Sequence, residues 1–173
     1  KRPAKKQMRH IRRNERGQLI IDGYIAVDLA EQFGTPLYVY SGDGLVAHYA
    51  AFTSSVSELD CVVHYAVKAN SSLGVLGLLA QQGAGADIVS GGEMKRALIA
   101  GIAPDKIVFS GVGKTDDEIR AALQAGIAQF NAESATELRH ISQIAAETER
   151  QAPVALRVNV NVDPGSHAKI STG

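Results

Sequence analysis

The feature that most constrains this chain is a repeat, from residue 60 onward, in which short β-branched runs alternate with helical patterns. Each run is brief and continuously apolar, which is typical of parallel strands buried on both faces. The runs cover Cys61 to Val67, Asp87 to Val89, Ile107 to Phe109, Ile127 to Phe130 and Val154 to Val160. Their ends, near Lys68, Ser90, Ser110, Asn131 and Val160, are 22, 20, 21 and 29 residues apart. The sequence therefore predicts about five consecutive strand–helix units.

The segments between these runs carry start and stop signals of helices. Three pairs have the spacing of a capping box, in which a hydroxyl and a carboxylate satisfy the first free amides of a helix. The pairs are Ser90 with Glu93, Thr115 with Glu118, and Ser134 with Glu137, and Gly83, Gly101 and Gly126 stand where C-terminal caps are expected. These signals support the strand–helix reading of the repeat.

Two architectures repeat strand and helix in this way, a barrel and an open doubly wound sheet. No Gly-x-Gly-x-x-Gly fingerprint opens the first strand–helix turn, and the near-even spacing suits a barrel better. The predicted fold class is therefore α/β, a partial (β/α)8 TIM barrel. Because a complete barrel usually needs about 250 residues, we expect the 173 residues to be the N-terminal portion of a longer protein.

The residues before the repeat divide into two segments. Residues 1–16 carry eight Lys or Arg against one acid, and we expect a basic, disordered extension rather than a nucleic-acid contact, because aromatic residues are not interleaved with the charges. Residues 17–42 include Pro36 to Tyr40, a predicted strand outside the repeat; the family resemblance given below implies that this segment contributes to a second, β-rich domain. A helix is predicted to start near Asp43, and residues 43–173 form the incomplete barrel.

Composition excludes several classes of protein. With 45% apolar residues and 17 glycines the chain is expected to be globular rather than disordered. No signal peptide is visible in this sequence, and no apolar run approaches the roughly 18 residues that span a membrane. We expect a cytoplasmic protein without membrane or nucleic-acid partners. No histidine pair has metal-ligand spacing, so no metal is predicted, and the single cysteine, Cys61, is expected to be a buried, inert thiol.

Reactive groups in such barrels gather at the C-terminal ends of the strands. Lys68 ends the first strand, where partial desolvation favours the uncharged amine, a nucleophile that can form a Schiff base with an aldehyde cofactor. Asp87 can orient that amine, and Arg157 interrupts the most apolar strand, where a buried guanidinium needs an acidic partner. The structural alternatives are a Lys68 that reaches solvent, an Asp87 that forms a turn after Gly85, and an Arg157 at an exposed edge.

Three stretches carry a resemblance to a known family. They are YAVKAN (Tyr65 to Asn70), GADIVSGGE (Gly85 to Glu93) and HAKISTG (His167 to Gly173). The first two resemble segments of the fold-type III pyridoxal-phosphate decarboxylases, whose barrel is of the alanine racemase-like type. The third resembles the His-x-x-Ile-Ser-Thr-Gly loop of the diaminopimelate decarboxylases within that family.

The resemblance implies both an activity and a site. The activity is decarboxylation of meso-2,6-diaminopimelate to L-lysine and CO2, a step of lysine biosynthesis, by a homodimer that acts on a small amino-acid substrate. Lys68 would carry pyridoxal 5'-phosphate, with Asp87 and Arg157 as catalytic and cofactor-binding residues that pair with one another. His167, Ser171, Thr172 and Gly173 would belong to a loop that covers the substrate.

The same resemblance places several required parts further along the chain. These include the glycine-rich phosphate-binding loop and the residues supplied near the dimer interface, so the fragment alone is expected to have little or no activity. Two alternatives remain open, a decarboxylase of another diamino acid of the ornithine or arginine type, and a non-catalytic interaction protein derived from the fold.

Overall fold

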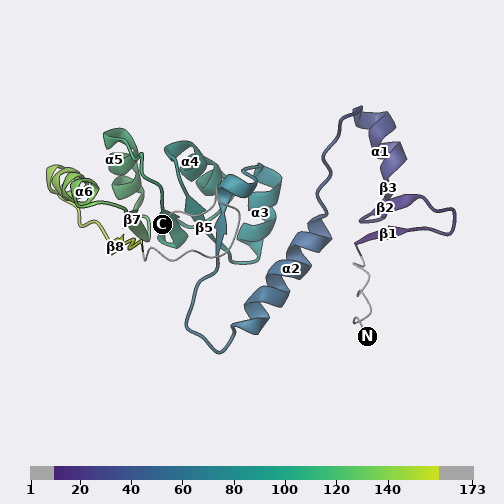
Figure 1. The fold of residues 1–173 in the computed structure, drawn as a ribbon, viewed down its shortest axis with the longest axis horizontal. Coiled ribbons are helices and arrows are strands. Elements are labelled where there is room, and N and C mark those ends of the chain that lie inside the picture. The colour runs from purple at the N-terminus through teal and green to yellow at the C-terminus, as the bar shows by residue number, and fades with distance from the viewer. Residues whose placement is uncertain (1–9, 160–173) are drawn as a thin grey trace.

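The computed structural model describes residues 10–159. It contains an antiparallel sheet of order β1-β2-β3 and a parallel sheet of order β4-β5-β6-β7-β8, which lie at opposite ends of an elongated molecule (Figure 1). The strands are β1 (Ile11–Arg13), β2 (Leu19–Ile21), β3 (Tyr24–Ile25), β4 (His64–Ala66), β5 (Gly85–Ile88), β6 (Ile107–Phe109), β7 (Gln129–Ala132) and β8 (Val154–Leu156). The helices are α1 (Ala26–Phe33), α2 (Gly42–Ser55), α3 (Leu73–Gln81), α4 (Gly91–Ile99), α5 (Asp116–Ala125) and α6 (Ala135–Glu147), with short 3-10 turns η1 (Val67–Ala69) and η2 (Pro104–Lys106).

The N-terminal sheet differs from the prediction. Part of the stretch expected to be a disordered extension forms β1, which pairs with β2. The hairpin between β2 and β3 turns at Asp22 and Gly23, both with positive φ, a conformation that the Asp-Gly dipeptide favours. Pro36 to Tyr40, predicted to be a strand, are exposed and pair with no strand in the described part of the chain, and their contribution to a second, β-rich domain stays a prediction.

The parallel sheet confirms the strand–helix repeat. All four neighbouring pairs of its strands are parallel, with α3, α4, α5 and α6 in the connections. The strand over Ile107–Phe109 was predicted with its observed bounds, whereas β5 and β7 each lie two residues from the predicted start. β4 is shorter than predicted, so Cys61 lies before it and is exposed, contrary to the expected buried thiol.

The predicted helix caps are formed, with one difference. Thr115 and Glu118 make a full capping box at the start of α5, and Gly126 ends that helix in the left-handed conformation (φ 72°, ψ 48°). Ser90 and Ser134 also accept the expected amide hydrogen bonds at α4 and α6. The two carboxylates of those helices instead accept from the amide one residue before the cap, Glu93 from Val89 and Glu137 from Glu133.

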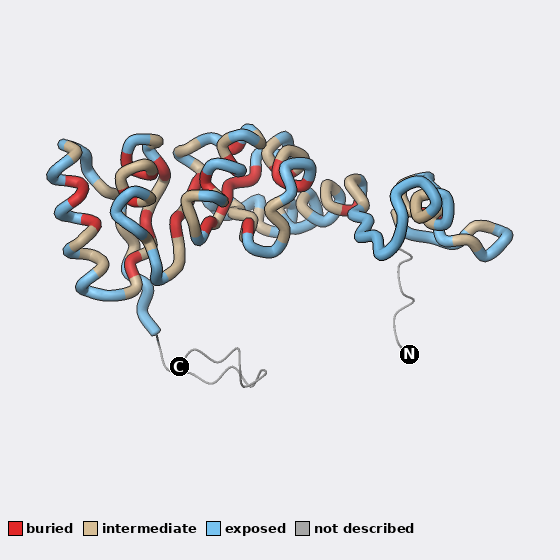
Figure 2. The backbone as a smooth tube through the Cα atoms, turned by 90° about the horizontal axis from the view of Figure 1, so that it is seen from above, coloured by how far each residue is buried: buried red, intermediate tan, exposed pale blue. Residues whose placement is uncertain are grey.

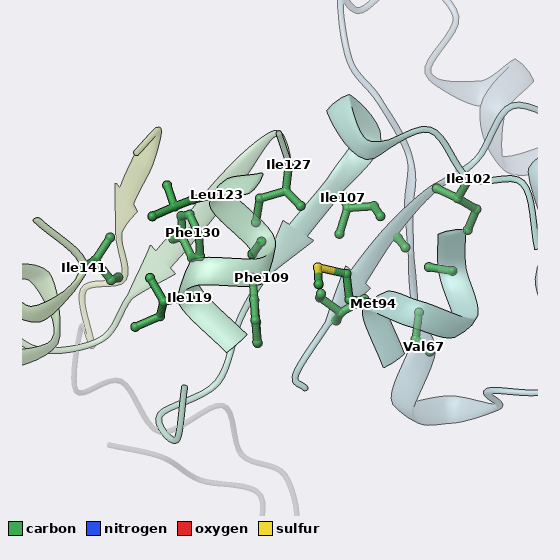
Figure 3. Close-up of a cluster of buried hydrophobic side chains, with 14 of the residues drawn as sticks. Val67, Met94, Ile102, Ile107, Phe109, Ile119, Leu123, Ile127, Phe130 and Ile141 are labelled. Carbon is green, nitrogen blue, oxygen red and sulfur yellow. The ribbon is translucent and has the colours of Figure 1, made fainter. Parts of the chain in front are cut away.

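One hydrophobic core joins the sheet to its helices. Strand residues Ile107, Phe109 and Phe130 pack in one cluster with helix residues such as Ile119 and Ile141, all of them fully buried (Figure 3). Each such side chain contributes roughly 1.5–3 kcal/mol when it leaves water. The rings of Phe109 and Phe130 stack with centroids 6.2 Å apart. This core sets the position of every strand end on which the candidate site stands.

The parallel sheet is buried on one face only in the described residues. Along β5, β6 and β7 the side chains that face α3–α6 are buried, and the alternate ones, Asp87, Val108, Ser110, Gln129 and Asn131, are half-buried. Burial is accordingly concentrated between the sheet and the row of helices (Figure 2). The prediction of strands buried on both sides is therefore corrected, and the open face carries the polar side chains. No helix within residues 10–159 is long and apolar enough to cross a membrane.

Candidate functional site

Lys68 lies in η1, directly after β4, at the C-terminal edge of the parallel sheet. Val67 is fully buried beside it, and the Tyr65 hydroxyl donates to the Asn70 carbonyl at 3.4 Å, so the turn is held on both sides. Burial raises the pKa of Tyr65 above its usual value. Lys68 is exposed, and its amine has no hydrogen bond or ion pair within residues 10–159. The expected desolvation of this amine is not provided by the described residues.

Asp87 lies on β5, the strand next to β4. It is in register with Ala66 on β4 and Val108 on β6, so these side chains share the face that the helices leave open. Lys68 follows Ala66 by two residues, and the two candidate residues therefore gather at the same end of neighbouring strands, as predicted. The Asp87 carboxylate accepts a hydrogen bond from the Ser110 hydroxyl, with 2.5 Å between Oγ and Oδ1.

Ser110 belongs to a row of polar side chains that crosses the open face. Asn131 Nδ2 donates to Ser110 Oγ at 2.9 Å, and Gln129 Nε2 donates to Asn131 Oδ1 at 2.8 Å. Sequence reasoning placed Ser110 and Asn131 at strand ends but assigned them no role. Alternation of polar and apolar residues within Gln129–Ala132 was the signal available for this row.

Arg157 is not paired with Asp87, so that predicted pairing is corrected. Its Nη1 lies 3.3 Å from Glu133 Oε1, and 56% of the Arg157 side chain is exposed. The difference follows from the order of the strands: Arg157 follows β8, whose neighbour is β7, while Asp87 is on β5. Glu133, at the end of β7, is therefore the nearer acid.

Lys114 is the largest feature that the sequence analysis missed. Its side chain is fully buried, and Nζ donates to the Gly111 carbonyl (2.6 Å), the Asn131 carbonyl (2.8 Å) and Glu137 Oε1 (2.9 Å). It also lies over the Phe109 ring, 5.5 Å from the centroid. Two of these partners are 17 and 23 residues away in the sequence, so no local pattern distinguishes Lys114 from a solvated loop lysine.

Two glutamates link the strand–helix loops to one another. Glu118 Oε1 accepts from the Gly91 amide at 2.7 Å, which joins α5 to the start of α4, and this bond is the main cause of the lowered pKa of Glu118. Glu133 Oε1 accepts from the Gly111 amide at 3.0 Å and also meets Arg157. The C-terminal edge of the sheet is thus a connected, preorganised rim.

A second cluster lies outside this edge. Ligand atoms of His10, Asp22 and Asp43 lie within 4.8 Å of one another, a juxtaposition not foreseen when no metal was predicted. Asp22 already accepts from the Ser41 hydroxyl (2.7 Å) and the Asp43 amide (3.3 Å) at the start of α2. A helix N-terminus attracts anions rather than cations, so the geometry is explained by capping of α2.

The predicted substrate loop, His167, Ser171, Thr172 and Gly173, lies outside the described residues. The site that the structure builds therefore consists of Lys68 and Asp87 on neighbouring strands, the row of Ser110, Asn131 and Gln129 beside them, and Arg157 further along the rim.

Lys68 and Asp87 come from neighbouring parallel strands, at the C-terminal edge where barrel enzymes carry their reactive groups, and a lysine amine there can bind an aldehyde cofactor. Residues 43–173 match the family described as pyridoxal-dependent decarboxylase, pyridoxal binding domain. The chain therefore belongs to the pyridoxal-dependent decarboxylases, which confirms the resemblance inferred from its motifs, and pyridoxal phosphate is the cofactor of this domain.

Individual relatives point in the same direction. Diaminopimelate decarboxylase of Vibrio cholerae is 52% identical over 159 residues, which cover 92% of this chain and 38% of the relative. The crystal structure of diaminopimelate decarboxylase from M. jannaschi superposes with a TM-score of 0.86 at 42% identity, over 95% of this chain and 39% of that one. The crystal structure of the Helicobacter pylori enzyme complexed with L-lysine superposes with a TM-score of 0.82 at 42% identity, over 85% of this chain and 37% of that one. The predicted fold class is confirmed, and the chain spans less than two fifths of the length of these relatives.

The residues present fit the cofactor in part. The Lys68 amine has no competing partner among the described residues, and Asp87 has one carboxylate oxygen engaged by Ser110 and the other without a hydrogen bond in the same part of the chain. Such a pair can bind an aldehyde covalently and hold the resulting positive charge.

Proposed function

We propose that a full-length protein carrying this sequence is a pyridoxal-phosphate-dependent decarboxylase that converts meso-2,6-diaminopimelate to L-lysine and CO2. The observation that supports this most is the 52% identity to a diaminopimelate decarboxylase over 92% of the chain, including the segment that bears Lys68. Homodimer formation and a cytoplasmic location remain predictions of this proposal.

Each candidate residue has a defined task in the proposed reaction. Lys68 would hold the cofactor through Nζ, and its amine could carry a proton when it is free. Asp87 orients Nζ and balances its charge. Arg157, held by Glu133 at the rim, supplies positive charge near the carboxylates of the substrate. The loop from His167 to Gly173 covers the bound substrate. Bound pyridoxal phosphate supplies an electron sink for the electron pair that CO2 leaves behind.

A substrate panel tests the proposal against its closest alternative. Purified full-length protein, loaded with pyridoxal phosphate, is given meso-2,6-diaminopimelate, L-ornithine, L-arginine or L-lysine, and CO2 and the amine product are measured. We expect turnover of meso-2,6-diaminopimelate and loss of that turnover by at least about 10³-fold in Lys68→Ala, the scale of losing covalent catalysis. Preferred turnover of ornithine or arginine would favour the second substrate class, and turnover of none would favour an interaction protein.

The cofactor lysine is identified separately from activity. Borohydride reduction of the protein with bound pyridoxal phosphate, followed by peptide mass spectrometry, is expected to find the label on Lys68 and none on the matched exposed lysine Lys95. Label distributed over many lysines contradicts the assignment. The 173-residue chain by itself is expected to release little or no lysine, since it spans 38% of the length of the V. cholerae relative.

A further inference from the structure

Gln129, Asn131 and Ser110 form a row of hydrogen bonds that ends at Asp87, and the direction of this row is fixed by its end. A carboxylate accepts but does not donate. Ser110 therefore donates to Asp87 (2.5 Å), and its own oxygen accepts from Asn131 Nδ2 (2.9 Å). The Asn131 carbonyl oxygen of the side chain then accepts from Gln129 Nε2 (2.8 Å). All donors point toward Asp87.

The members of this row stand on or directly beside paired strands. The Ser110 amide donates to the Ile88 carbonyl at 2.8 Å, which continues the pairing of β5 with β6. The main-chain carbonyl of Asn131 accepts from Lys114 Nζ at 2.8 Å, and the Lys114 side chain is fully buried. Groups mounted in this way hold a geometry more closely than groups on loops.

We propose that Ser110, Asn131 and Gln129 are positioning residues that hold Oδ1 of Asp87, so that its second oxygen faces the Lys68 amine. The inference rests on the proposed function, because it assigns Asp87 to the amine that binds the cofactor. Lys114 acts one step further away, since it pins the end of β7 that carries Asn131.

The hydrogen bonds of this row do more than satisfy polar side chains on the open face of the parallel sheet. A carboxylate held at one oxygen loses rotation about its last bond, and a displacement of about 1 Å at a reacting group costs up to ~10²-fold in rate. Hydrogen bonds aligned in one direction also strengthen one another. Water could satisfy each of these side chains separately, but it would not fix the plane of the Asp87 carboxylate.

The direct test compares Ser110→Ala with Ser110→Thr in the full-length holoenzyme. Alanine removes the donor to Asp87, while threonine keeps the hydroxyl. We expect Ser110→Ala to lower kcat by about 10- to 100-fold with KM changed less than about 3-fold, to change the absorption spectrum of bound pyridoxal phosphate, and to slow borohydride labelling of Lys68. Threonine should restore all three. Ser41→Ala, which removes the α2 cap far from this row, should lower the Tm alone.

A double-variant cycle tests whether Asn131 acts through Ser110. Asn131→Leu alone should reproduce much of the Ser110→Ala change in the cofactor spectrum, because Ser110 is then free to turn its hydroxyl away from Asp87. In Ser110→Ala/Asn131→Leu the two effects should not add. Additive effects would mean that Asn131 does not act through Ser110 and would overturn the row as a unit.

The outcomes separate this inference from the proposed function. If the wild-type protein decarboxylates meso-2,6-diaminopimelate while Ser110→Ala matches it in kcat, spectrum and labelling, the positioning role is wrong and the function stands. If no tested diamino acid is decarboxylated but Ser110→Ala still changes the spectrum and labelling of Lys68 and threonine restores them, the positioning role stands and the function is wrong.

Discussion

At the scale of single residues, Lys114 is the clearest case of a side chain whose burial has a cost that its partners offset. The ammonium group is removed from water, but it donates to two carbonyls and to Glu137, of whose side chain 12% is exposed. Removing one partner of such a group leaves the others buried without a hydrogen bond. This destabilises the fold more than replacing all partners by apolar groups of similar shape.

We therefore expect Lys114→Met to lower the free energy of unfolding by about 3–5 kcal/mol. The length of the side chain is kept, so the loss measures the charge and its three hydrogen bonds. Lys95, exposed on α4, provides the control, and Lys95→Met should change stability by less than about 0.5 kcal/mol. Urea unfolding of the full-length protein checks both variants, and equal effects at the two sites would contradict the assigned role.

Two glycines make a second prediction at this scale. A Cβ on Gly85 would lie 2.6 Å from His64 Cδ2 and 2.6 Å from the Lys106 carbonyl, and the latter is main chain that cannot move aside. Gly85→Ala should cost roughly 1–3 kcal/mol of unfolding free energy. At Gly77, inside α3, the nearest atom is 3.9 Å away, so Gly77→Ala should stabilise by up to about 1 kcal/mol. Thermal unfolding should show a lower Tm for Gly85→Ala and a higher Tm for Gly77→Ala. Shifts of the same sign in both variants would refute the packing argument.

At the scale of elements, Glu118 joins two helices through their ends. It completes the capping box of α5 and at the same time accepts from the Gly91 amide at the start of α4. The carboxylate thus lies near the positive ends of two helix dipoles. Hydrogen bonds from Gly91 and Thr115 to the charged form lower the pKa of Glu118 below its usual 4.5.

A lowered pKa in the folded state stabilises the protein above the unfolded value and stops doing so as the pH falls through the folded value. Glu118→Gln should therefore cost about 1 kcal/mol at pH 7, an estimate discounted for the exposure of this group. The difference in unfolding free energy between variant and wild type should shrink as the pH falls below 4.5, the usual pKa of a glutamate. Unfolding measured at several pH values tests this, with exposed Glu31→Gln as the control; a cost that stays constant into acid would contradict the linkage.

At the scale of the whole molecule, much apolar surface is left uncovered by the described residues. Large exposed side chains lie along the N-terminal segment, at the end of β8 and directly after it, among them Tyr24, Phe33, Tyr38, Leu156 and Val158. Monomeric proteins rarely expose large contiguous apolar areas, and unpaired strand edges associate readily. β8 is such an edge among the described strands.

The 173-residue chain by itself is consequently expected to self-associate at micromolar concentration. Light scattering after size-exclusion chromatography should give masses above the 18.3 kDa of one chain. Leu156→Lys places a charge on the exposed β8 edge and should reduce the associated fraction. A monodisperse 18.3 kDa species at all concentrations would show that these surfaces do not drive association.

The success of sequence reasoning followed the range of the interactions involved. The cap at Thr115 and Glu118 and the C-terminal glycine Gly126 are determined by contacts within four residues, and they were predicted correctly. The strand predicted over residues 36–40 is not formed among the described residues, because a strand exists only with a partner and β propensity alone does not supply one. The turn between β2 and β3 is also local, since the Asp22-Gly23 dipeptide favours the positive φ angles found there.

Within the candidate site the same division holds. Lys68 and Asp87 were predicted because each follows or occupies a strand whose apolar character is readable locally, and both lie at the C-terminal edge of the sheet. Arg157 was predicted to pair with Asp87 but pairs with Glu133, because strand order decides which acid is near. The substrate loop beyond residue 159 remains a prediction.

The sequence by itself determined the strand–helix repeat, its helix caps, the position of Lys68 after a strand and the family, since apolar periodicity, capping and motifs are local properties of a chain. Only the tertiary structure decided that Lys114 is buried, that Ser110 and Asn131 lead to Asp87, and which face of the sheet is open. Those residues lie 17 to 23 positions apart in the sequence, and they meet because parallel pairing brings the ends of successive strands to one edge.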